Sequence, residues 1–155
     1  MQISEFKKAV GKFPTGVCVI STIFDDKLWG LTANSFVSVS LSPPLISFCL
    51  DKNSGSFVAF QNSDFFSVNI LANDQEEISK HFAQSFADKF SGIDYDLGQF
   101  NVPHIKGIVS LLECKKYSEV DGGDHIIFIG EVLKAQVDDS KLPMLYYARS
   151  YRNLI

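Results

Sequence analysis

Most of the chain alternates hydrophobic and polar residues with the period of a β-strand. Five segments rich in β-branched or aromatic residues are bounded by turn residues and predict strands: 15–22, 45–50, 65–71, 108–120 and 125–137. The Gly122-Gly123 pair between the last two segments predicts a hairpin. Residues 91–107 show little periodicity and contain several Gly and Pro residues, which predicts a long loop.

Helical spacing is limited to three short segments. They cover residues 3–12, about 54–61, and 74–86, the last with Ile78, Phe82 and Phe86 on one face. Strands therefore outnumber helices, and most connections are too short for βαβ crossovers. Because the 155 residues contain no internal repeat or linker, we expect a single domain over 1–155. The expected fold is a mainly antiparallel barrel or sandwich with a few covering helices.

The stretch from Gly30 to Leu50 has no charged residue. If it continues as a strand, alternate positions form an apolar core face: Leu31, Ala33, Ser35, Val37, Val39 and Leu41. The opposite face carries neutral hydrogen-bonding groups around one aromatic ring: Thr32, Asn34, Phe36, Ser38 and Ser40. Such a face suits a half-exposed edge strand, a surface covered by a second subunit, or a wall for a planar, partly polar ligand. The pattern leaves these three interpretations open.

Charge and motif content exclude several classes of function. The net charge of −4 argues against a nucleic-acid binder, and no apolar run reaches the ~18 residues of a membrane span. The N-terminus lacks the apolar segment of a secretory signal, and three widely spaced cysteines suggest reduced thiols in a cytoplasmic protein. Gly-rich phosphate loops, GxSxG and HExxH do not occur. No metal site is expected, because the three histidines are isolated from other ligand residues.

Six motifs in sequence order resemble one known family. They are FPTGVCVIST (13–22), GLTANSFVSVSLSPPLISFCLDKNS (from Gly30), FSVNIL (66–71), ADKFSG (87–92), GGDHIIFIGEV (122–132) and PMLYYARSYRNL (143–154). Together they cover almost the whole chain and are similar to the short-chain flavin reductase-like family. This resemblance implies a six-stranded antiparallel Greek-key split β-barrel, usually a homodimer with flavin at the subunit interface.

The resemblance also implies an activity. Family members transfer hydride from NADH or NADPH to FMN or FAD, and many supply the reduced flavin to a separate monooxygenase. One rival is a relative that retains FMN and passes electrons to a metal or protein acceptor, in the manner of ferric reductases or flavoredoxin. The rival from another class is a non-enzymatic flavin-binding module.

Candidate site residues follow from the same resemblance. The family's contacts to the flavin ring edge and ribityl chain, and the wall that continues them, correspond to Thr32, Ala33, Asn34, Ser35, Ser38, Ser40 and Leu41. Its ribityl and phosphate segment corresponds to Cys49, Asp51, Lys52, Asn53, Ser54 and Ser56. The remaining matches are a basic-aromatic pair with Lys89 on the phosphate, a residue beside the nicotinamide, and two pocket-shaping residues: Lys89, Phe90, His125, Arg149 and Tyr151.

Each of these positions also has a structural interpretation. Plain strand packing is the alternative for the ring-edge set, and an ordinary turn and helix cap is the alternative for the segment 51–56. A solvated lysine is the alternative for Lys89, a structural histidine at a strand start for His125, and dimer packing for Arg149 and Tyr151. His81 and His104 are expected to be structural, and Trp29 is expected in the core or an interface.

Overall fold

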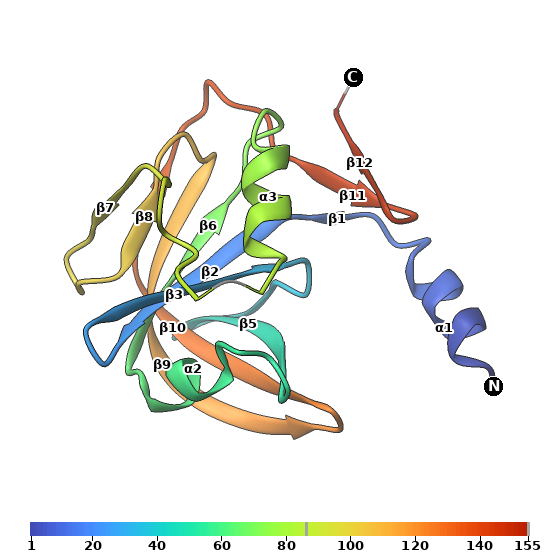
Figure 1. Cartoon of the computed structure of the whole chain (residues 1–155), viewed down its shortest axis with the longest axis horizontal. Coiled ribbons are helices and arrows are strands. Elements are labelled where there is room, and N and C mark those ends of the chain that lie inside the picture. Colours follow the sequence, from blue (N-terminus) through green and yellow to red (C-terminus); the bar gives the residue numbers. More distant parts are fainter. Residues whose placement is uncertain (86, 155) are drawn as a thin grey trace.

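A seven-stranded antiparallel sheet forms the centre of the molecule (Figure 1), in a computed structural model that describes residues 1–85 and 87–154. The strand order is β3-β2-β6-β9-β10-β5-β4. The strands are β2 (Cys18–Phe24), β3 (Lys27–Ala33), β4 (Val37–Leu41), β5 (Pro44–Asp51), β6 (Phe65–Ile70), β9 (Ser110–Gly122) and β10 (His125–Val137). The expected mainly antiparallel β fold is confirmed. The sheet has seven strands where six were expected, and the pairings among the described strands do not close it into a barrel.

Aromatic residues from distant strands form the first hydrophobic core. Phe48 of β5 stacks on Phe128 of β10 with ring centroids 5.3 Å apart, and meets Phe66 of β6 edge-on at the same distance. Helix α2 (Phe57–Asn62) adds Phe60 to this cluster. Aromatic rings favour such offset and edge-on contacts. The many Phe residues of the sequence thus supply the side chains of this first core.

Strand β2 is buried on both faces along residues 18–22, so it contributes to two hydrophobic clusters. Cys18 and Ile20 belong to the first core, whereas Val19 packs in a second cluster with Phe82. Phe82 belongs to α3 (Glu76–Phe82), which covers the opposite face of β2 and β3. This explains why residues 18–22 show no alternation of exposure.

The N-terminal helix lies beside the C-terminal hairpin, away from the central sheet (Figure 1). Helix α1 (Ile3–Val10) has no buried residue, and β1 (Thr15–Gly16) pairs with β11 (Leu145–Tyr147), which pairs with β12 (Ser150–Arg152). The N-terminal segment and the C-terminal hairpin therefore lie on the same side of the molecule. Among the helices in the described part of the chain, none has the length and apolar character needed to cross a membrane.

Two local predictions differ from the structure. Residues 91–107 are not a plain loop, because they contain an antiparallel ribbon of β7 (Tyr95–Leu97) and β8 (Pro103–Ile105). Buried side chains of β6 hold this ribbon, since the Asn69 Oδ1 accepts a hydrogen bond from the Ile105 amide at 2.9 Å. Helix α3 stops at Phe82, well before the predicted end, and the predicted contribution of Phe86 lies outside the described residues.

The predicted core face of the uncharged stretch is wrong beyond Ala33. Val37, Val39 and Leu41 are 56, 50 and 94% exposed. The strand breaks between Ala33 and Val37, and β4 begins at the opposite end of the sheet from β3. Because alternation cannot be carried across a break, the side-chain parity of β3 says nothing about β4.

A fully buried carboxylate lies beneath the β7–β8 ribbon. Glu113 of β9 has its Oε1 3.2 Å from His104 Nε2 and 3.5 Å from Lys134 Nζ, and its Oε2 accepts the Phe100 amide at 3.1 Å. Within the described residues, neither His104 Nε2 nor Glu113 Oε1 has a well-aligned hydrogen bond. The nearby Lys134 ammonium therefore compensates the Glu113 carboxylate by proximity. Burial lowers the pKa of His104 despite the opposing attraction of Glu113.

The lowered pKa of His104 predicts acid sensitivity. In the unfolded chain a histidine titrates near pH 6.5, so below that pH the unfolded state binds a proton before the native state does. The free energy of unfolding should therefore fall as the pH drops from about 6.5 toward the lower native pKa. Urea denaturation at several pH values should show a smaller fall for His104→Asn. Parallel curves for the two proteins would contradict this assignment.

Candidate functional site: a cavity along the free edge of β3

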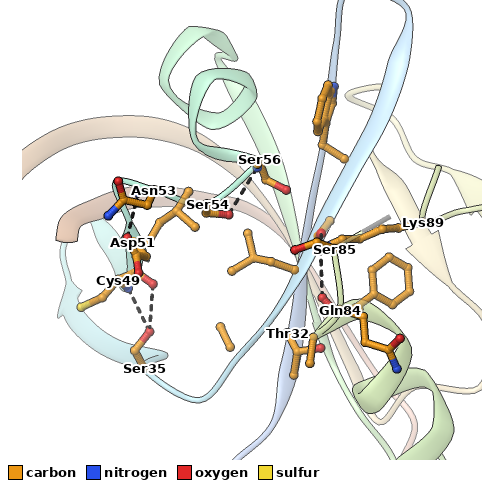
Figure 2. A pocket seen from close by; sticks show the side chains of 18 of the residues that line it. Thr32, Ser35, Cys49, Asp51, Asn53, Ser54, Ser56, Gln84, Ser85 and Lys89 are labelled. Carbon is orange, nitrogen blue, oxygen red and sulfur yellow. Dashed lines mark hydrogen bonds between the residues drawn. The ribbon is translucent and has the colours of Figure 1, made fainter. Parts of the chain in front are cut away.

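A cavity of about 420 Å³ runs along the edge of β3 that has no strand partner in the described structure (Figure 2). The segment after α3 forms one wall, and the segment leading from β5 into α2 forms the other. The predicted site residues that line it are Thr32, Ala33, Asn34, Ser35, Cys49, Asp51, Asn53, Ser54, Ser56, Lys89 and His125. The structure thus brings together most of the positions expected to contact a ligand.

The free edge of β3 offers backbone groups to this cavity. The Gly30 carbonyl accepts a hydrogen bond from Lys89 Nζ at 2.9 Å, which shows that it points away from β2. In an antiparallel strand alternate residues direct both backbone groups to the same edge, so Thr32 presents its amide and carbonyl beside Gly30. This edge is suited to a ligand with several neutral donors and acceptors.

Three hydrogen bonds join β3, α3 and the wall that follows α3. Thr32 Oγ1 donates to the Ser79 carbonyl at 2.6 Å, and Lys89 Nζ donates to the carbonyls of Gly30 and Phe82 at 2.9 and 3.0 Å. Burial among these groups lowers the pKa of Lys89. Lys89 therefore joins the end of α3 to β3 and anchors the wall, in addition to placing a positive charge at the cavity.

Short-range hydrogen bonds order the opposite wall. Ser35 Oγ accepts the Cys49 amide at 2.9 Å and donates to its carbonyl at 3.4 Å, which ties the bend after β3 to β5. Asp51 Oδ1 accepts the Asn53 amide at 2.8 Å, and the side chain of Ser54 accepts the amide two residues further on. These bonds hold the polar segment 51–56 in place (Figure 2).

His125 stands at the start of β10, where the cavity meets the β9–β10 turn. Its Nδ1 lies 2.7 Å from Asp124 Oδ1, and this hydrogen bond lowers the pKa of Asp124. Asp124 is thus ionised at neutral pH and accepts, so Nδ1 carries the proton. The pairing fixes the ring while its side chain remains 41% exposed.

Several predicted site residues lie elsewhere in this chain. Ser38, Ser40 and Leu41 are on β4, at the far end of the sheet order from β3. Lys52 Nζ is bound by Asp121 and by the Gly123 carbonyl.

The other three displaced candidates belong to the second core or to the terminal hairpin. Phe90 is 5% exposed and packs edge-on against Phe82. The Tyr151 hydroxyl bonds Ser79 Oγ at 2.8 Å, and Arg149 lies in the β11–β12 turn beside α1. The ligand contacts expected of Phe90, Tyr151 and Arg149 stay predictions.

The sequence that builds this cavity and sheet matches a known family model. A family model described as "Flavin reductase like domain" matches residues 10–154. The chain belongs to the flavin reductase-like family.

Individual flavin reductase-like relatives cover nearly the whole chain. A flavin reductase of Pseudomonas putida is 38% identical over 147 residues, which are 94% of this chain and 86% of the relative. The reductase subunit HsaB of a flavin-dependent monooxygenase from Mycobacterium tuberculosis is 37% identical over 151 residues, covering 96% of this chain and 81% of the relative. The structure of the Streptomyces globisporus NADH:FAD oxidoreductase SgcE6 with NAD and FAD fragments superposes with a TM-score of 0.94, at 37% identity over 98% of this chain and 92% of that one.

Sequence reasoning missed part of the flavin reductase-like cavity. The additional lining residues are Leu28, Trp29, Gly30, Leu31, Leu50, Gly55, Phe82, Ala83, Gln84, Ser85 and Ala87. Most belong to the first half of β3 or to the wall after α3, where a helix was expected to continue. A sequence signal existed only for Gly30, since glycine within a strand marks a close approach. Within the described residues no group of His, Cys, Asp and Glu is arranged to hold a metal.

Proposed function

We propose that this protein is an NAD(P)H-dependent flavin reductase that transfers hydride to FMN or FAD and supplies the reduced flavin to a separate monooxygenase. The observation that carries this proposal is the cavity along the uncharged, hydrogen-bonding free edge of β3, in a chain matched by the flavin reductase-like model over residues 10–154. A planar ring with donors and acceptors along its edge fits such a wall without burying a charge. Relatives named as reductase subunits of monooxygenases support a separate monooxygenase as the acceptor of the reduced flavin.

The proposed binding mode divides the cavity between ring and phosphate. Backbone groups of Thr32 and Asn34 hold the ring edge, and the ordered segment 51–56 holds the ribityl chain and phosphate through hydroxyl and amide donors. Lys89 contributes a positive charge from the opposite wall, which it also anchors. The Asp51 carboxylate is already engaged by the Asn53 amide, which limits its repulsion of a phosphate.

The chain's chemical task is alignment. A bound flavin supplies the ring nitrogen that accepts hydride, so no protein base is needed for that transfer. His125 is proposed to position the nicotinamide through its exposed ring edge, with Asp124 fixing the ring's orientation. Alignment of this kind is sensitive to displacements of about 1 Å.

This role predicts an asymmetric effect of His125→Ala. The rate of flavin reduction by the nicotinamide should fall about tenfold or more, because the donor is less well aligned, whereas flavin affinity should change less. Rapid-mixing kinetics and flavin titration measure the two quantities separately. Asp124→Asn, which keeps the ring but weakens its orientation, should show an intermediate rate. Equal losses of rate and affinity in His125→Ala would refute the positioning role.

A homodimer is proposed to complete the site. Apolar side chains remain exposed on β4 and along α1 and its C-terminal end: Val37, Val39, Leu41, Ile3, Phe6, Val10 and Phe13. Clusters of exposed apolar side chains are typical of an interface. We propose that a second subunit covers these surfaces, that Ser38, Ser40 and Arg149 act at this interface, and that the sheet corresponds to the family's six-stranded split barrel. Sedimentation equilibrium would reveal a monomer if the dimer is wrong.

The reductase proposal is tested by steady-state oxidation of NADH and NADPH with added FMN, FAD or riboflavin. Stimulated oxidation of either nucleotide is expected, and no oxidation with any flavin would contradict the proposal. A flavin that remains bound through purification would favour the FMN-retaining electron-transfer protein. The three free cysteines support a cytoplasmic location for this chemistry.

A further inference from the structure

A buried serine in the middle of helix α3 contacts two segments that are far apart in the sequence. Ser79 is fully buried, although serine favours caps and turns over helix interiors. Its Oγ shares a hydrogen bond of 2.8 Å with the Tyr151 hydroxyl of β12, and its carbonyl accepts Thr32 Oγ1 of β3 at 2.6 Å. One buried residue therefore connects the C-terminal hairpin to the strand whose free edge forms the cavity.

The Ser79 carbonyl accepts two hydrogen bonds at once. Besides Thr32 Oγ1, the Ala83 amide donates to it at 3.2 Å, at the end of α3. A carbonyl oxygen has two lone pairs, so both bonds can form. The hydroxyl proton of Thr32 is used in this contact, which leaves the backbone amide as the donor that Thr32 offers to the cavity. Where that amide lies depends on where α3 holds the side chain of Thr32.

Packing fixes Tyr151 on the other side of Ser79. Its ring packs edge-on against Tyr146, with ring centroids 5.3 Å apart, and both rings pack against the second hydrophobic cluster. Tyr151 is not among the described residues that line the cavity, so its effect on a ligand in the same subunit passes through other residues. A phenol held in this way keeps the serine hydroxyl paired, and a buried hydroxyl that lost its partner would be costly.

We infer that Tyr151 is a positioning residue for the flavin ring, which acts through Ser79 on the backbone of Thr32. The inference rests on the proposed reductase function and adds a residue outside the cavity to the control of flavin binding. The ring is common to riboflavin, FMN and FAD, and the proposed phosphate segment 51–56 lies on the opposite wall. A displacement of Thr32 should therefore weaken the binding of all three flavins by the same factor.

Flavin titration of Tyr151→Phe tests this role, because the variant loses only the hydroxyl. The dissociation constants of riboflavin, FMN and FAD should each rise about three- to tenfold, the effect of one neutral hydrogen bond. The visible absorption bands of the bound flavin should also shift, because the bonds to the ring edge change. Tyr146→Phe is the matched control, since Tyr146 lies opposite Tyr151 in the same hairpin and its hydroxyl has no hydrogen bond to the described residues. The control should bind all three flavins as the unmodified protein does.

A double-mutant cycle shows whether Tyr151 acts through Ser79. Ser79→Ala removes the same hydrogen bond from the other side, so the double variant should bind flavin no more weakly than either single variant. Losses that add in the double variant would overturn the inference, and so would a loss confined to FMN and FAD. A Tyr151→Phe protein that is less stable in urea but binds flavin as Tyr146→Phe does would show a purely structural role.

The same variants keep this inference separate from the reductase proposal. Flavin affinities that follow the expected pattern, in a protein that oxidises neither NADH nor NADPH, would refute only the reductase. Nucleotide oxidation with flavin affinities that are unchanged in Tyr151→Phe would refute only the positioning role.

Discussion

Gly30→Ala is expected to lower the free energy of unfolding by about 1–3 kcal/mol, the range typical of overpacking, and to weaken flavin binding. A Cβ at this position would lie 2.8 and 3.0 Å from two ring atoms of Phe82 and 3.2 Å from Phe90. The Phe82 ring is fully buried and edge-packed, so it cannot swing aside. The wall after α3 must move away from β3, and this strains the bond from Lys89 Nζ to the Gly30 carbonyl.

Urea denaturation and flavin titration measure the two effects of Gly30→Ala. Gly16→Ala is the control, because a Cβ there meets no atom within 4 Å. The control should retain stability and flavin affinity. If Gly30→Ala behaves like Gly16→Ala, the close contact between β3 and the wall is not needed for the site.

Glu113→Ala is expected to cost about 2–5 kcal/mol in unfolding free energy, the range typical of truncating a large, fully buried side chain and leaving a cavity. The change leaves Lys134 and His104 without their carboxylate and the Phe100 amide without its acceptor. Since His104 and Phe100 belong to the segment 95–105, the β7–β8 ribbon should also become sensitive to proteolysis. Urea denaturation and limited proteolysis at neutral pH check both results.

Two variants separate the charge of Glu113 from its shape and from surface electrostatics. Glu113→Gln keeps an acceptor for the Phe100 amide and should lose less stability than Glu113→Ala. Glu77→Ala removes an 89% exposed partner of Lys80 and should cost at most about 1 kcal/mol. A loss for Glu113→Ala no larger than that for Glu77→Ala would show that the buried cluster does not stabilise the fold.

The parts of the fold that depend on local pattern could be predicted from the sequence. Alternation and turn residues located the main strands and the β9–β10 hairpin, whose two-residue turn includes Gly123 at φ 80°. The break after Ala33 could not be predicted, because Asn34 and Ser35 also occur within ordinary strands. The β7–β8 ribbon was missed because its three-residue strands are too short to show a period and are stabilised by Asn69 from a distant strand.

In the candidate site, too, the sequence indicated which segments take part but not the contacts between distant elements. Resemblance brought the segments around Thr32, Asn53 and His125 to one cavity, and the structure places them there. It did not reveal that Lys89 anchors a wall, because the carbonyls that it meets come from β3 and the end of α3. The cavity-facing position of Trp29 was also hidden, since the sequence does not show which side chains of β3 the two cores leave out.

Direct hydride transfer is the central claim, and anaerobic rapid mixing tests it most directly. The protein with FMN or FAD is mixed with NADH, or with NADH deuterated at the transferring position, and the absorbance of the oxidised flavin is followed. The proposed function predicts reduction much faster than in a mixture without protein, with a lower rate for the deuterated donor. Reduction at the rate of the protein-free mixture would contradict it.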